Sequence, residues 1–219
     1  MKKRIVITGI GLITPIGLDK NETWQSLTSG DSGIDTISCF DAEAYETKIA
    51  AEVKGFDPTI LIGKKESRRL DRFSQFAVAS SIQALADANI DMEKEDQSRV
   101  GVMIGSGVGG IITLSEQYSV LEKRGPTRVS PFLIPMMLGD MASGQVSMSI
   151  GAKGPNFSVV SACATGADSI GIAAEMIKDE RIDVAIAGGT EAAICPIAVA
   201  GFNSCMALPK SNDNPKRAS

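Results

Sequence analysis

The chain has 219 residues, of which 43% are hydrophobic and 22% are charged, so it has ample material for a core in one large domain or two small ones. Its net charge of −4 and pI of about 5.0 lack the basic footprint that nucleic-acid-binding proteins carry. No apolar run approaches the roughly 20 residues that span a bilayer, and the N-terminal MKKRIVITGIG is too short and too interrupted by glycine for a signal peptide.

Strand-like and helix-like runs alternate along the chain. The strand-like runs are KRIVITG (3–9), TKIAAEV, VGVMIGSG (100–107), NFSVV (156–160) and DVAIAGG. The helix-like runs are NETWQSLTSG, ending at Gly30; ESRRLDRFSQFAVASSIQALADAN, with Asn89 as its C-cap; IITLSEQYSVLEKRG; parts of SPFLIPMMLGDMASGQVSMSIG, with breaks at Pro135 and Gly139; and GADSIGIAAEMIKD. This alternation predicts an α/β fold. Because no repeat or low-complexity linker divides the chain, we expect a single domain over 1–219.

The chain contains four cysteines, at positions 39, 163, 195 and 205, and no histidine. No two cysteines form a CxxC pair, and the usual mixed zinc sites lack their histidines, so we expect no metal and no cofactor. Without an export signal, we expect four reduced thiols and a cytoplasmic location.

The segment GSGVGG (105–110) follows a strand and satisfies the pattern GxGxxG. A dinucleotide site would need a following strand with an acidic residue about 20 positions on. A helix and then GPTRVSPFLIP follow instead. We therefore expect these glycines to allow close packing of a helix on a sheet, or close approach of backbone to a ligand.

The segment KKESRRLDR gathers cations in an otherwise acidic chain. If the segment is one helix, spacings of three and four place most of them on one face. They would attract an acidic partner or a phosphate, although such runs also occur on solvated helix faces. The residues are Lys64, Lys65, Arg68, Arg69 and Arg72.

Cys163 stands at the join between NFSVV and a helix-like run over 164–178. Small and apolar residues dominate that run, apart from Asp168 and Glu175 on one stripe, so we expect a helix buried nearly all round. A thiol at its N-terminus would have a lowered pKa and a nearby backbone N–H for a developing oxyanion. This favours Cys163 as a nucleophile, and we expect the other three cysteines to be inert packing residues.

The absence of histidine excludes a Cys–His pair within this chain. Three possibilities stay open at this point. The helix dipole alone activates Cys163, or the partner residues lie on other polypeptide, or Cys163 is structural.

Five segments, VITGIGLITPIG, IGSGVGG, GPNFSVVSACATGADSIG, VAIAGGTEA and SNDNPKRAS, occur in this order. Together they resemble the N-terminal half of a β-ketoacyl-[acyl-carrier-protein] synthase of the elongating type, similar to synthase II of bacterial fatty-acid synthesis. The resemblance implies a thiolase-like fold, an α-β-α-β-α sandwich whose N-terminal half is a mixed sheet flanked by helices. It also implies that Cys163 accepts an acyl chain from acyl carrier protein. The carbanion formed when malonyl-carrier protein decarboxylates then attacks the thioester to give the 3-oxoacyl product.

The resemblance assigns further roles residue by residue. Val108 matches the gate of the acyl pocket, where larger residues restrict chain length, and Phe202 matches an aromatic of that pocket. Leu133 matches a position that reaches the pocket across a dimer, and Ala162 beside the nucleophile is also assigned to the pocket. The five cations of KKESRRLDR match the helix on which the carrier protein, with its acyl or malonyl phosphopantetheine, docks. We expect a homodimer in which strand 156–160 pairs with its copy, since an exposed edge is normally covered.

The chain also departs from the family. Two catalytic histidines, a lysine and a Gly-rich oxyanion loop lie in the family's C-terminal half, whereas this chain ends at Ser219, so we expect a truncated or split synthase. Met206 and Pro209 stand where the family usually has an Arg and a Ser. The alternatives are a non-catalytic half-protein that folds or dimerises, which the absence of histidine favours, and a thiolase-type enzyme acting on coenzyme A esters.

Overall fold

The computed structural model describes residues 4–218, which form two compact units. The first unit comprises residues 4–11 and 58–192, and the second comprises residues 12–57 and 193–218. The expectation of one family domain over 1–219 stays a prediction.

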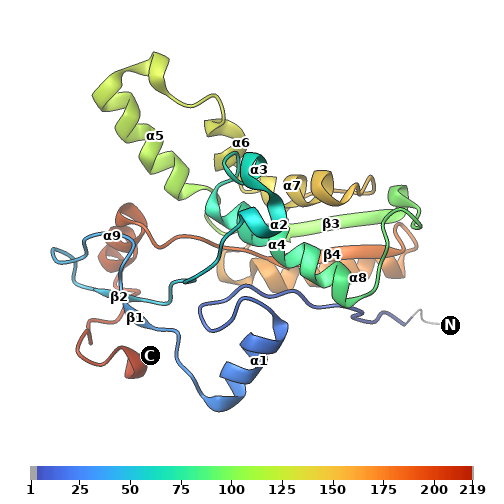
Figure 1. Cartoon of the computed structure of the whole chain (residues 1–219), viewed down its shortest axis with the longest axis horizontal. Helices are drawn as coiled ribbons and strands as arrows, with labels where there is room; N and C mark the ends of the chain where they lie inside the picture. Colours follow the sequence, from blue (N-terminus) through green and yellow to red (C-terminus); the bar gives the residue numbers. More distant parts are fainter. Residues whose placement is uncertain (1–3, 219) are drawn as a thin grey trace. The chain divides into compact units, whose positions relative to one another are not determined.

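The first unit contains a parallel strand pair and most of the helices. Its strands are β3 (Val100–Gly105) and β4 (Val184–Gly189), in register from Val100↔Val184 to Gly105↔Gly189. Its helices are α2 (Thr59–Ile62), α3 (Lys64–Ser67), α4 (Arg72–Asp87), α5 (Ile111–Arg124), α6 (Leu133–Met137), α7 (Met141–Ile150) and α8 (Thr165–Lys178), with 3-10 turns at Gln97–Arg99, Pro126–Arg128 and Ala162–Ala164. Helices around a parallel strand pair confirm the predicted α/β class (Figure 1).

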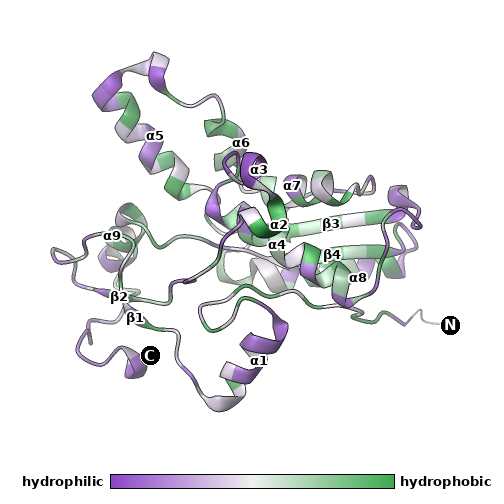
Figure 2. Ribbon diagram, in the orientation of Figure 1, coloured by the Kyte–Doolittle hydropathy of each residue, from purple (hydrophilic) through white to green (hydrophobic). Residues whose placement is uncertain are grey.

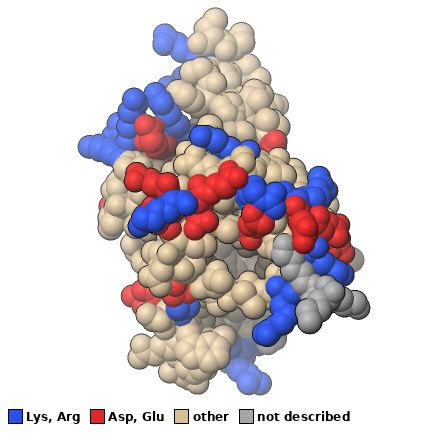
Figure 3. Space-filling view, turned by 90° about the vertical axis from the view of Figure 1, so that its right-hand side faces the viewer, with Lys and Arg blue, Asp and Glu red and all other residues tan. Residues whose placement is uncertain are grey.

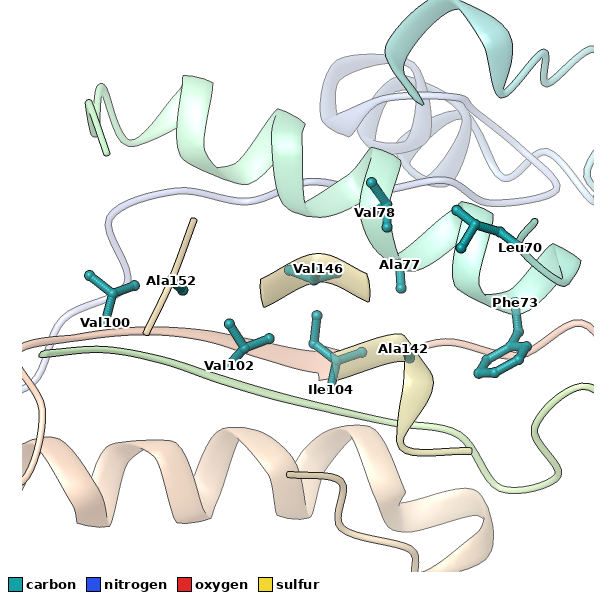
Figure 4. Close-up of a cluster of buried hydrophobic side chains, with 10 residues drawn as sticks. All are labelled: Leu70, Phe73, Ala77, Val78, Val100, Val102, Ile104, Ala142, Val146 and Ala152. Atoms are coloured by element: carbon teal, nitrogen blue, oxygen red, sulfur yellow. The ribbon is translucent and has the colours of Figure 1, made fainter. Parts of the chain in front are cut away.

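The strand pair of this unit is covered on both faces. Val100, Val102 and Ile104 alternate along β3 and pack against α4 and α7. Figure 4 shows Val102 and Ile104 on one side of the strand, facing Val146. On the other face, Met103 is fully buried in a cluster with residues of α8. Each fully buried apolar side chain of this size contributes about 1.5–3 kcal/mol to folding.

Hydropathy follows this arrangement. Figure 2 shows β3 and β4 in green and white, whereas α3 is purple. Near-continuous apolar strands are typical of parallel sheets that helices cover on both sides.

Charges of both signs mix on the surface at the start of the strands. The Arg99 guanidinium pairs with the Asp183 carboxylate, and its Nη2 also donates to Glu180 O at 3.0 Å. In the view of Figure 3, Lys and Arg side chains lie beside Asp and Glu side chains, so that face carries no large area of one sign.

The second unit is smaller and rich in loops. Its elements are α1 (Lys20–Ser29), β1 (Asp35–Thr36), β2 (Ile49–Ala50), α9 (Pro196–Ser204) and a 3-10 turn at Pro215–Arg217. As expected, Gly30 ends α1, in the left-handed conformation. The run TKIAAEV forms only a two-residue strand, paired antiparallel with β1. A hydrogen bond connects the segment near the C-terminus to the residue before β2, since Lys48 N donates to Asn212 Oδ1 at 2.8 Å.

Two predicted strands are not formed as ladders. In KRIVITG, residues 4–9 are not in a strand, and Val6 and Ile7 are 64% and 78% exposed; Lys3 lies outside the described residues. NFSVV is represented by a single parallel bridge between Asn156 and Val102. Both predictions rested on β-propensity, which forms a strand only where a neighbouring backbone is available to pair with it.

Two predicted helix boundaries are also wrong. The run ESRRLDRFSQFAVASSIQALADAN is interrupted, because the Asp71 side chain accepts from Phe73 N and starts α4 there. Asp71 is buried and also accepts from Thr113 N and Thr113 Oγ1, at 3.0 and 2.6 Å. Pro135 does not break α6, because proline is tolerated in the first turn, where its missing N–H has no partner anyway. The expected break around Gly139 is present between α6 and α7.

Candidate active site

Cys163 lies in the 3-10 turn Ala162–Ala164, immediately before α8, and is exposed. The turn is sharp, since Ala162 has φ +52° and Ser161 N donates to Thr165 Oγ1 at 2.9 Å. The predicted helix over 164–178 is α8, which begins at Thr165. The thiol is therefore accessible to an electrophile and stands at the positive end of a helix of 14 residues.

The expected all-round burial of this helix is wrong. Its buried residues, Thr165, Ser169, Ala173 and Met176, form one face toward the sheet. Ile170 next to this face is 50% exposed, and Asp168 and Glu175 are exposed as well. The Ser161 hydroxyl donates to the Asp168 carboxylate and links the turn to the first turn of α8. Composition alone could not predict the exposed face, because small and apolar residues occupy both faces of the helix.

Glycines bring the end of β3 against the nucleophile turn. A Cβ at Gly105 would lie 2.3 Å from both Thr165 Cγ2 and Val159 O, and one at Gly110 would lie 2.1 Å from Met136 O. Any side chain would overlap these atoms, so the glycines permit close packing, as the sequence predicted.

Glu191, which the sequence patterns did not single out, holds this Gly-rich loop. Its Oε1 accepts from Ser106 Oγ at 2.9 Å, and its Oε2 accepts from Gly107 N at 3.0 Å and Val108 N at 3.2 Å. A signal was present, since Ser106 lies near the C-terminal end of one predicted strand and Glu191 lies just after another, and the carboxyl ends of parallel strands meet at one edge where ligands bind.

The residues assigned to the acyl pocket divide between the two units. Val108 is 44% exposed in the Gly-rich loop, and Ala162 is exposed beside Cys163. The two segments are close, since a Cβ at Gly107 would lie 3.5 Å from Ala162 O. Leu133 is the first residue of α6 and is half-buried. Phe202 is 44% exposed on α9 in the second unit. Their pocket role stays a prediction.

The basic segment is accessible but is not one helix. Lys64 and Lys65 lie in α3, Arg68 and Arg69 in the following turn, and Arg72 at the start of α4. The first four are exposed, whereas Arg72 is half-buried. Burial lowers the pKa of Arg72, which stacks over the Phe76 ring at 4.7 Å. Arg69 stacks over the Phe132 ring at 5.2 Å. Their carrier-docking role stays a prediction.

The expectation that the other three cysteines are buried packing residues holds for Cys195 and is wrong for Cys39 and Cys205, which are exposed. Cys195 is buried at the start of α9, and the exposed Cys205 donates to Phe202 O at 3.4 Å. Cys39 is exposed as a residue, but its thiol lies against Ile194 O and near Glu52. Loss of hydrating water, together with the hydrogen bond and charge of Glu52, raises the pKa of Cys39 to about 12. Cys39 is therefore a poor nucleophile at neutral pH.

Neither a metal-binding cluster nor a membrane-spanning helix is present in residues 4–218. Within that range, no group of three or more His, Cys, Asp or Glu residues is arranged to hold a metal ion. In the same range, no helix is long and apolar enough to cross a bilayer.

The sequence family described as "Beta-ketoacyl synthase, N-terminal domain" matches residues 2–219. The chain belongs to this family. It is 46% identical, over 218 residues, to 3-oxoacyl-[acyl-carrier-protein] synthase 2 of Synechocystis sp. (strain ATCC 27184 / PCC 6803 / Kazusa), covering 100% of this chain and 52% of that protein. It is 45% identical over 218 residues to the protein of that name from Coxiella burnetii (strain RSA 493 / Nine Mile phase I), covering 100% of this chain and 53% of the relative. The chain thus spans about half the length of the curated relatives it matches.

Solved structures agree with the family. The crystal structure of a β-ketoacyl synthase from Burkholderia phymatum STM815 superposes with a TM-score of 0.85 at 31% identity, covering 98% of this chain and 53% of that one. The ishigamide ketosynthase/chain length factor superposes with a TM-score of 0.83 at 28% identity, covering 94% of this chain and 51% of that one. The resemblance and the thiolase-like fold inferred from the sequence are confirmed.

Proposed function

We propose that this chain carries the nucleophile of a fatty-acid-elongating β-ketoacyl-[acyl-carrier-protein] synthase. In the proposed reaction, the Cys163 thiolate attacks the carbonyl of an acyl thioester on the carrier protein, and the sulfur of the carrier's phosphopantetheine leaves as a thiolate. Malonyl-carrier protein then loses CO2, and the resulting carbanion attacks the Cys163 thioester. This second attack releases the thiolate and forms 3-oxoacyl-carrier protein.

The observation that carries the proposal is the exposed Cys163 in the sharp turn at the start of α8. Backbone N–H groups at a helix start lack carbonyl partners within the helix and can stabilise an oxyanion. The names of the two relatives described above, both 3-oxoacyl-[acyl-carrier-protein] synthase 2, support the carrier protein as the substrate carrier. They favour it over coenzyme A, the carrier of the thiolase-type alternative. The four free cysteines support a cytoplasmic location.

The acylation step is tested on the polypeptide that the gene encodes. Purified protein is mixed with acyl-carrier protein, and peptides are examined for a thioester by mass spectrometry. We expect the acyl group on Cys163 and its loss in Cys163→Ala. Cys205→Ala, which removes another exposed thiol, serves as the matched control. Acylation that persists in Cys163→Ala would refute the proposed role.

The exposed cations Lys64, Lys65, Arg68 and Arg69 form the proposed carrier-protein surface. Four neighbouring positive side chains attract an acidic protein and speed encounter. We expect Arg68→Glu to slow acylation from the carrier protein but not from a small acyl thioester, which needs no docking. The matched control is Lys94→Glu, an exposed cation in the loop before β3. An equal loss with both donors would contradict a docking role.

We also propose a homodimer that covers the segment 156–160. One side of this segment is engaged, since Phe157 N donates to Val102 O at 3.3 Å, while Val160 is 63% exposed. A segment beside β3 that exposes a large apolar side chain is a natural site for pairing with a second copy. Light scattering on the complete polypeptide should give twice the monomer mass, and a monomer at micromolar concentration would refute the proposal.

A further inference from the structure

The hydrogen-bonding groups of the Gly-rich loop converge on one carboxylate. Glu191 accepts from Ser106 Oγ, Gly107 N and Val108 N, at 2.9, 3.0 and 3.2 Å. Ser106 Oγ in turn accepts from Gly109 N at 2.8 Å. Three successive backbone N–H groups, from Gly107 to Gly109, are therefore held by Glu191 directly or through Ser106. Bonds to an ionised acceptor are roughly twice as strong as neutral ones.

Glu191 is itself placed by the residue before it. Thr190 N donates to Gly105 O at 3.0 Å, and Thr190 Oγ1 donates to Phe73 O at 2.7 Å. The end of β4 is thus joined to the end of β3 and the start of α4. On the far side of the loop, Gly110 N donates to Met137 O at 3.0 Å.

The held loop lies directly beside the nucleophile turn. A Cβ at Gly107 would be 3.1 Å from Glu191 Oε2 and 3.5 Å from Ala162 O. Gly109 has φ +71°, a conformation that a glycine adopts without strain. Val108 lies between Gly107 and Gly109, and glycines restrict the backbone conformation little. The carboxylate of Glu191 supplies the restraint instead.

We infer that Glu191 is a positioning residue that fixes the Val108 loop beside Cys163 and so sets the length of acyl chain that Cys163 accepts. This inference rests on the proposed function, in which Val108 gates the acyl pocket. Without the carboxylate, two backbone donors and the Ser106 hydroxyl lose their acceptor, and the loop carrying Val108 becomes free to yield to longer chains. Hydrophobic pockets discriminate between acyl groups that differ by one methylene by about 10–200-fold. If the Val108 loop is no longer held, the loss of chain-length selectivity is therefore large enough to measure.

The test compares Glu191→Ala, Glu191→Gln and Glu116→Ala in the polypeptide that the gene encodes. A series of saturated acyl thioesters, from short to long, is offered, and acylation of Cys163 is followed by mass spectrometry. Each rate is divided by the iodoacetamide alkylation rate of Cys163 in the same variant, which removes general changes in thiol reactivity. Glu116 is an exposed carboxylate on α5, so its replacement controls for the lost charge.

We expect Glu191→Ala to reduce the ratio of the best to the worst chain length by at least about tenfold. Glu191→Gln should retain most of the selectivity, because its carbonyl oxygen still accepts from Gly107 N and Val108 N and its amide donates to Ser106 Oγ. Glu116→Ala should match the parent. If Glu191→Ala does not fold, Ser106→Ala decides, since it removes the link to Gly109 and should also lower the ratio.

Two results would overturn the inference. Selectivity within about twofold of the parent in Glu191→Ala, or in Ser106→Ala where that variant decides, would exclude the positioning role while leaving acylation of Cys163 intact. No acylation of the parent by any thioester of the series would overturn the proposed function and this inference together.

Discussion

Replacing Gly105 with alanine perturbs the packing between the end of β3 and the nucleophile turn. The new Cβ would lie 2.3 Å from Thr165 Cγ2 and 2.3 Å from Val159 O. Thr165 is the first residue of α8, and its Oγ1 accepts from Ser161 N. The overlap therefore acts on the segments that enter and leave the turn containing Cys163.

The size of the effect follows from these distances. Val159 O is backbone, and Thr165 is 3% exposed, so neither atom can move aside freely. Ordinary carbon contacts lie near 3.5 Å, so the segments must separate by about 1 Å. Overpacking of this kind destabilises a fold by about 1–3 kcal/mol. A misplacement of about 1 Å at a reacting group costs about a hundredfold in rate.

The assay measures urea unfolding and the acylation rate of Cys163 in Gly105→Ala, made in the polypeptide that the gene encodes. The matched control is Gly144→Ala in α7, where the nearest atom to a new Cβ is Met141 Sδ at 3.6 Å. That control should be neutral or stabilising by about 0.5–1 kcal/mol, because alanine favours a helix. Parent-like stability and acylation in Gly105→Ala would refute the argument that Gly105 sets the position of the nucleophile turn.

Three further predictions follow from the cysteines, the missing histidines and a hydrogen-bonded carboxylate. Under limiting iodoacetamide, Cys163 should be alkylated first, because it stands at the start of α8, whereas Cys195 is buried, the pKa of Cys39 is about 12 and the Cys205 thiol donates to Phe202 O. Preferential labelling of Cys39, Cys195 or Cys205 on mapped peptides would contradict this. The 219-residue chain alone should release no CO2 and form no 3-oxoacyl product from acyl- and malonyl-carrier protein, because it has no histidine. The loss of a single hydrogen-bond donor to the transition state already lowers the rate about 100–1000-fold. Turnover near that of a complete synthase would disprove this. Burial opposes ionisation of Glu52, but hydrogen bonds from Ser38 and Cys39 outweigh it and lower the pKa of Glu52 to about 2. The ionised Glu52 therefore stabilises the fold above the unfolded pKa of about 4.3, and this contribution is lost as pH falls toward 2. Urea unfolding should place Glu52→Gln about 2 kcal/mol below the parent at neutral pH, with the difference vanishing near the acid limit; a difference that does not depend on pH would count against this reasoning.

The sequence alone determined β3, β4 and α8, although not the segment 156–160 that leads to Cys163. VGVMIGSG (100–107) and DVAIAGG were predicted as buried strands and contain β3 and β4, although only β3 is fully buried and β4 is half-buried. The helix after Cys163 was predicted to within one residue. These features depend on local rules: apolar runs of strand length, small residues in a helix, and a cysteine between the two. For the same reason, the position of Cys163 just before a helix and the role of the glycines in close packing could be inferred from the sequence.

Only the tertiary structure decided which distant residues meet. The α4 start at Asp71 depends on Thr113, 42 positions later, and the Gly-rich loop depends on Glu191, 85 positions after Ser106. The exposed face of α8 and the unpaired run at residues 4–9 have the same origin. A helix face is buried, and a strand is formed, only when another segment lies against it. The hydrophobic periodicity of one segment does not identify which other segment that will be.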